Sequence, residues 1–174
     1  MVDSANSRYG VTAAPDGLDI VQELLNTASA GLRDPTPDLL AESDTAQRWA
    51  DAALVARGLP PASVDAESLR ALRETIRAAV SGDTASIVPH LHSVALTLDE
   101  SGTVVAGLEN DVAGLVFAEM LRAQARGEWS RLKLCALGQC SVAFHDRSKN
   151  RSARYHAARC ANYVNLRNSR ARNV

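Results

Sequence analysis

Cys135-Ala-Leu-Gly-Gln-Cys140 and Tyr155-His156-Ala-Ala-Arg159-Cys160 are the two stretches of sequence around which the C-terminal part of this chain is organised. Together they give the spacing C-x4-C-x15-H-x3-C, and they contain all three cysteines and one of the four histidines. A segment this short cannot bury a hydrophobic core of its own, so it needs a staple. Three cysteines cannot all pair as disulfides, and a metal is therefore the staple that we expect.

The spacing fits a tetrahedral zinc site. Zinc takes four ligands at about 2.0–2.3 Å, and thiolates with an imidazole satisfy it. Cys135 and Cys140 can bind from one turn, and the three-residue gap places His156 and Cys160 on one face of a helix. We predict one structural Zn²⁺ per chain, held by these four residues. The alternative is three unpaired cysteines beside an incidental histidine.

The charge of the chain divides it into two parts. Residues 1–130 contain 9 Lys+Arg and 19 Asp+Glu, a net charge of −10, whereas residues 131–174 contain 10 Lys+Arg and one acid, a net charge of +9. Such an asymmetry indicates two segments with different partners. We predict an acidic domain over residues 1–130 and a basic zinc module over residues 131–174.

The first 130 residues are predicted to be mostly helical, since Ala, Leu, Val and Arg dominate and aromatic residues make up only 4%. Apolar residues recur at helical spacing in five segments, over residues 18–28, 43–57, 65–80, 84–92 and 109–125. Alternating apolar residues on both sides of an Asp-Glu-Ser-Gly turn predict a β-hairpin over residues 93–106.

In the zinc module we expect a short strand at residues 142–144, a turn at residues 146–150 and a helix that begins near Ser152. The predicted fold class is therefore mostly α. It comprises a helical N-terminal domain with one small β-hairpin, and a small C-terminal zinc-finger module built from a knuckle and a helix.

A dense pattern of residues in this module resembles the CGNR zinc-finger family. It consists of Arg131, Lys133, Cys135, Cys140, Phe144, Asp146, Ser148, Lys149, Asn150, Ser152, Arg154, Cys160 and Asn162. Two stretches depart from the family pattern. Tyr155-His156 stands where the family has Trp-Cys, and Cys160-Ala-Asn-Tyr163 stands where it has Cys-Gly-Asn-Arg.

The N-terminal part is similar to the ABATE domain, the usual partner of that family. The similarity is carried by Leu24 to Thr27, by Asp38 to Leu40 together with Trp49, and by Leu69 to Arg73. The two resemblances together imply a DNA-binding transcriptional regulator with a regulatory or dimerising N-terminal domain.

Basic and amide side chains of the module are the candidates for contact with double-stranded DNA. Cationic side chains bind phosphates, and Asn and Arg pair with the edges of adenine and guanine. The predicted DNA contacts are Arg147, Lys149, Arg151, Arg154, Arg159, Asn162, Arg167 and Arg170. The alternative is that the basic tail docks on the acidic domain of its own chain or on a protein partner.

The N-terminal domain has two predicted roles. One small zinc finger buries little surface on DNA, so we expect a homodimer assembled through this domain. A small-molecule effector could bind in a pocket between helices, lined by Asn26, Trp49, Arg73, His90 and His92. The alternative is that Trp49 is a core residue and that Arg73 pairs with an acid such as Glu42 or Asp44.

Other classes of function fit the sequence less well. The chain has no Gly-rich phosphate loop and no hydrolase or metalloprotease motif, so we expect no catalytic activity. It has no run of eighteen or more apolar residues, so we expect no membrane span. The N-terminus lacks the features of a signal peptide, and we expect a cytoplasmic protein.

Overall fold

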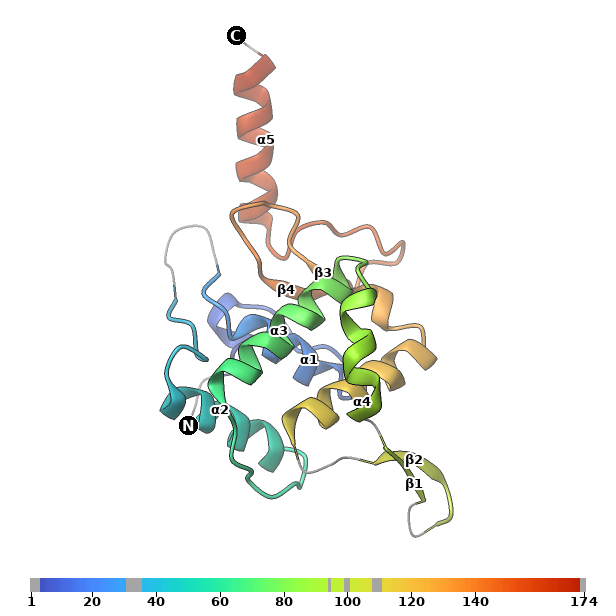
Figure 1. Ribbon diagram of the computed structural model, residues 1–174. Coiled ribbons are helices and arrows are strands. Elements are labelled where there is room, and N and C mark those ends of the chain that lie inside the picture. Colours follow the sequence, from blue (N-terminus) through green and yellow to red (C-terminus); the bar gives the residue numbers. More distant parts are fainter. Residues whose placement is uncertain (1–3, 31–35, 94, 99–100, 108–110, 173–174) are drawn as a thin grey trace.

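The computed structural model is mostly helical, as the sequence predicted (Figure 1). It describes residues 4–30, 36–93, 95–98, 101–107 and 111–172, with the backbone alone described at 90–93, 95–97 and 104–107. The α-helices within these residues are α1 (Leu18–Asn26), α2 (Ser43–Val55), α3 (Ala66–Val80), α4 (Val112–Ala125) and α5 (Ala158–Arg172). Short 3-10 helices are η1 (Ser7–Tyr9), η2 (Ala85–Ser93) and η3 (Trp129–Arg131). Helices α1 to α4 form a packed body, and α5 projects from it.

Two antiparallel hairpins complete the fold. The first pairs β1 (Ala95–Leu98) with β2 (Val104–Gly107) and confirms the predicted hairpin; residues 99 and 100 of its expected turn lie outside the described residues. The second pairs β3 (Leu132–Leu134) with β4 (Ala143–His145), with Leu132 opposite His145. The strand expected at residues 142–144 is β4 within one residue, but its partner β3 was not predicted.

One hydrophobic core joins the helical body to the second hairpin. In α3, the side chain of Asp65 accepts a hydrogen bond from the Ser68 amide and so caps the helix. The apolar stripe of the same helix turns inward, and Trp49 of α2 is only 4% exposed, which confirms its interpretation as a core residue. Leu132 of β3 and Ala143 of β4 belong to this same core, so buried packing continues from the helices into the C-terminal segment.

Two predicted helices differ from those observed. The prediction of a helix starting near Ser152 was wrong, because α5 begins at Ala158. The Ala153 amide donates to Asp146 Oδ2 (3.0 Å) and the Arg154 carbonyl accepts from the Ala136 amide (2.8 Å). These backbone groups are therefore engaged outside any helix. The segment expected as a helix over residues 84–92 is the 3-10 helix η2, with a proline inside it.

Arg73 is a structural residue of the body. Its guanidinium binds both carboxylate oxygens of Asp38, at 2.8 and 2.7 Å, and donates to Thr27 Oγ1 at 3.1 Å. An acidic partner was predicted, but the observed partners are Asp38 and the exposed Glu74, 3.3 Å from Arg73 Nε, and not Glu42 or Asp44. Burial opposes ionisation of Asp38, yet the hydrogen bonds from Arg73 and the charge beside it hold the pKa of that carboxyl below its usual range. Among the described residues, every helix is too short or too polar to cross a bilayer.

Candidate metal centre

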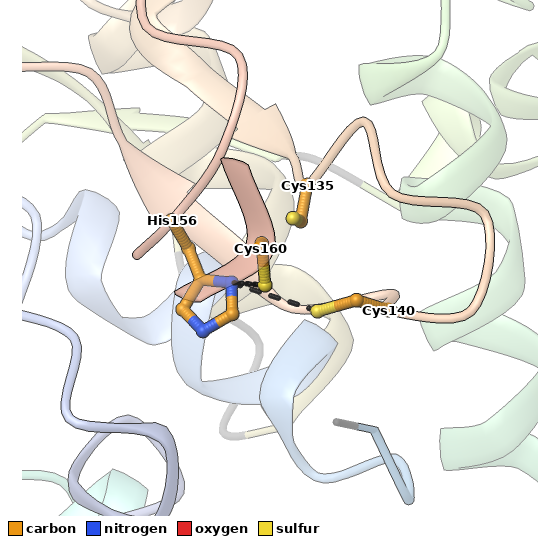
Figure 2. A group of neighbouring side chains, drawn as sticks. All are labelled: Cys135, Cys140, His156 and Cys160. Atoms are coloured by element: carbon orange, nitrogen blue, oxygen red, sulfur yellow. Dashed lines mark hydrogen bonds between the residues drawn. The ribbon is translucent and has the colours of Figure 1, made fainter. Parts of the chain in front are cut away.

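Four side chains converge at the base of α5 (Figure 2). Cys135 directly follows β3, Cys140 lies between the two strands of the hairpin, His156 lies two residues before α5, and Cys160 lies in its first turn. Their ligand atoms all lie within 4.8 Å of one another. These are the four residues that the spacing predicted, although His156 precedes the helix and does not share a helical face with Cys160.

The distances fit a tetrahedral zinc ion. His156 Nδ1 lies 3.5 Å from Cys140 Sγ and 3.6 Å from Cys160 Sγ. A tetrahedron with Zn–S of about 2.3 Å and Zn–N of about 2.0–2.1 Å has a sulfur–nitrogen edge of about 3.5–3.6 Å. The observed separations therefore match the edges of a zinc site in which Nδ1 is the ligating nitrogen.

The protonation states also fit a divalent cation. Burial raises the pKa of the Cys140 thiol to about 12, and the neighbouring Cys135 and Cys160 add to the shift. Burial likewise raises the pKa of Cys160. Burial, and then the charge of Arg159, lower the pKa of His156 and favour the neutral imidazole that a metal requires. The Cys140 and Cys160 thiols need a positive charge beside them to ionise, and a zinc ion would supply it.

Residues 131–173 match the family model of the CGNR zinc finger. The match and the geometry together support one structural zinc ion per chain. The family model covers only the C-terminal segment, residues 131–173, which we call the zinc finger from here on. The resemblance of residues 1–130 to the ABATE domain remains a prediction. No curated protein matches the chain.

Residues from the first 30 positions of the chain pack against the three cysteines of the zinc site. A second buried cluster contains Tyr9, Ala30, Cys135, Leu137, Cys140, Val142 and Cys160. The hydroxyl of Tyr9 accepts a hydrogen bond from the Ala30 amide (2.9 Å) and lies 2.6 Å from the Ala28 carbonyl, to which it donates. Residues distant in sequence thus cover the metal ligands, as expected for a site that stabilises structure.

A clamp between the body and the zinc finger, formed by Asn26, Gln22 and Arg77, holds the chain just after Cys140. Asn26 Nδ2 donates to the Ala143 carbonyl at 2.9 Å, and Asn26 Oδ1 accepts from the Ala143 amide at 2.8 Å. Gln22 Nε2 also donates to the Ala143 carbonyl, at 3.4 Å. Arg77 Nη1 donates to the Ser141 carbonyl at 3.0 Å. Asn26 is fully buried. Its side-chain amide makes the two hydrogen bonds to the Ala143 backbone that a neighbouring strand would make at this edge of β4.

Asp146 organises the loop between β4 and α5. Its side chain is buried and binds Lys133 Nζ at 2.7 Å, the Ser148 amide at 2.9 Å and the Ala153 amide at 3.0 Å. Burial alone would raise the pKa of Asp146, but the hydrogen bonds from Lys133 and Ser148 outweigh it and hold the pKa well below the usual range. Lys133 and Asp146 matched the family pattern, but the sequence did not assign them this role.

The eight predicted DNA contacts are all exposed. Arg147, Lys149, Arg151 and Arg154 lie on the loop that Asp146 organises, and Arg159, Asn162, Arg167 and Arg170 lie on α5. Two of the loop residues also contact the rest of the chain. Arg147 Nη2 donates to the Ala13 carbonyl at 2.9 Å and Arg151 Nη1 to Ser130 Oγ at 3.1 Å.

The residues of the predicted effector pocket have other partners or are not described. Asn26 binds Ala143, Trp49 lies in the core and Arg73 binds Asp38. The side chains of His90 and His92 lie outside the described residues.

Proposed function

We propose that this chain is a DNA-binding transcriptional regulator whose zinc finger contacts duplex DNA. The observation that carries the proposal is the charge of α5. From Ala158 to Arg172 the helix contains four arginines and no acid, and Cys160 is its only buried residue within the described part of the chain. Such a helix offers an array of cations to an anionic partner.

The cations of α5 have no acidic partner among the described residues. Each ion pair found there joins two residues that both lie outside this helix. Figure 1 shows α5 pointing away from the helical body. This direction favours a partner outside the chain over docking of the tail on the acidic body, the alternative that the sequence left open.

The loop 146–154 extends the same basic surface. Its exposed residues Arg147, Lys149, Arg151 and Arg154 precede α5 in the chain, and the zinc ligand Cys160 fixes the first turn of that helix. Zinc with four protein ligands has no open coordination position, which supports a structural role and not a catalytic one. In this proposal the metal positions the basic loop and α5 relative to each other.

Two finer features remain predictions from the sequence. We propose that the helical body assembles a homodimer, because one zinc finger offers limited contact area on DNA. We also retain an effector that acts through the body as a hypothesis.

The proposal is tested by fluorescence anisotropy with a labelled duplex of mixed sequence, titrated at several salt concentrations. The logarithm of the association constant should fall by about 0.9 for each logarithmic unit of salt per phosphate neutralised. The double substitution Lys149→Gln and Arg167→Gln should reduce that slope by about 2, because both residues are predicted to contact phosphates. Arg48→Gln, at an exposed arginine on α2, is the matched control and should leave it unchanged. Absence of duplex binding, or binding insensitive to salt, would favour a protein partner.

A further inference from the structure

We infer that α5 is a helix that reads base edges in the DNA major groove, through one defined face. This inference rests on the proposed function and adds which groove and which side chains are involved. The reading face consists of Arg159, Asn162, Tyr163, Leu166 and Arg170.

The spacing of these residues places them together. They follow one another at intervals of three, one, three and four residues, so they share one side of a helix with 3.6 residues per turn. Cys160 is fully buried at the zinc site, and Val164 packs on the second cluster. Neither lies on the reading face, since Cys160 is about 100° and Val164 about 140° around the helix from Arg159. Burial of Cys160 at the zinc site therefore fixes the rotation of the helix about its axis, and the five residues of the reading face are exposed.

The reading face exposes two large side chains, Leu166 and Tyr163, whose contact with water is unfavourable. Leu166 is 54% exposed and Tyr163 is 36% exposed, although both are large apolar residues on a helix rich in polar side chains. Arginine and asparagine flank them. A combination of amide, guanidinium and aliphatic groups matches the major groove, which presents acceptors and donors beside the thymine methyl group.

The dimensions of α5 suit this groove. Fifteen residues give a helix of about 22 Å in length and about 10–12 Å in diameter, and the major groove of B-DNA is about 12 Å wide. From Arg159 to Arg170 the helix rises about 16 Å, the length of about five base pairs. Because α5 projects from the helical body (Figure 1), it can lie in the DNA groove without a clash between the body and the sugar-phosphate backbone.

The chemistry of four of these five side chains indicates the base that each would contact. Arg159 and Arg170 pair with guanine, Asn162 pairs with adenine, and Leu166 contacts the methyl group of thymine. Arg167 lies seven residues after Cys160, off the reading face, and binds phosphate. The major groove of A-form RNA is too deep and narrow for side chains to read. The inferred partner is therefore duplex DNA of mixed sequence that contains adenine and thymine.

The first experiment selects bound duplexes from a random pool with the full-length, zinc-loaded protein. The wild-type protein should enrich a motif with an adenine that Asn162→Ala no longer distinguishes, a loss of roughly 5- to 150-fold in discrimination. Asn168→Ala is the matched control, because Asn168 is also exposed on α5 but lies off the reading face. It should enrich the wild-type motif.

The second experiment tests the predicted contact between Leu166 and a thymine methyl group by a change in the DNA. Uracil in place of thymine in the selected motif removes only the methyl group. This replacement at one position should weaken binding by the wild-type protein, and Leu166→Ala should bind both duplexes equally.

The outcomes separate the two proposals. If the protein binds no duplex, the proposed function fails. If it binds duplexes without enriching a motif, the proposed function stands and the inference about α5 is overturned. Equal effects of Asn162→Ala and Asn168→Ala, or preference for duplex RNA of the same sequence, overturn it as well.

Discussion

Substitution of Asn26 by alanine should destabilise the helical body and the zinc finger together. The change leaves the Ala143 amide and Asn6 Oδ1 without the hydrogen bonds that Asn26 makes to them, and all three residues are at most 2% exposed. Each buried polar group left unsatisfied costs about 1–3 kcal/mol. The Ala143 carbonyl keeps its bond to Gln22. We expect a loss of about 3 kcal/mol in the free energy of unfolding, which lowers Tm by about 6–12 °C in a chain of this size.

Urea and thermal unfolding of Asn26→Ala measure the change, with Asn168→Ala as the control. Asn168 is exposed on α5, and its substitution should alter stability by less than about 0.5 kcal/mol. A loss below about 1 kcal/mol for Asn26→Ala would refute the reasoning, since it would mean that Ala143 finds other partners.

Zinc release provides a second measurement of the same change. Ala143 lies three residues after Cys140, so the weaker clamp of Asn26→Ala should speed the transfer of zinc to a chromogenic chelator. Leu54→Ala removes a fully buried side chain of α2 and should cost about 2–5 kcal/mol without changing the rate of zinc release from the folded protein. Equal acceleration by both substitutions would show that zinc release follows general stability and not the clamp.

Three further predictions concern the metal and the pH dependence of stability. His156→Ala should weaken zinc binding far more than His145→Ala, measured by chelator competition, because His145 pairs with Glu128 and lies outside the ligand set; equal effects would show that the fourth ligand is misassigned. Chelation of zinc should raise amide hydrogen exchange most in α5 and the loop before it, because the metal ligands fix these elements whereas β3 and β4 are also held by the body; unchanged exchange there would show that the metal does not order them. Asp38 has a lowered pKa in the folded chain, so it stabilises the fold above its unfolded pKa of about 3.9 and loses this contribution as the pH falls through its folded pKa. Asp38→Asn should therefore be less stable than the wild type at pH 6, and the difference should shrink in acid; a constant difference would contradict the role of its ionisation.

The metal ligands could be predicted from the sequence because their identity and spacing carry the chemistry. The four predicted residues converge in the structure. The position of His156 was predicted less well, since the hydrogen bonds of Ala153 and Arg154 that delay the start of α5 depend on Asp146 and Ala136. Local sequence does not reveal such partners.

The clamp could not be predicted for a related reason. Asn26 lies 117 residues before Ala143, and a buried asparagine in a helix has no pattern that indicates a backbone partner so distant. The match of Lys133 and Asp146 to a family pattern did not indicate which interactions they make. Their ion pair depends on the packing of the hairpin against the loop, which the sequence does not reveal.

The clamp also limits which piece of this protein can be moved to another. A chimera that carries residues 131–173 alone would keep all four metal ligands, yet it would lose Asn26 and Arg77 and leave their backbone partners in β4 and beside Cys140 to find new ones. Grafting α1 and α3 with the segment would preserve both contacts. The portion able to act as an interchangeable cassette is therefore larger than the portion that binds the metal.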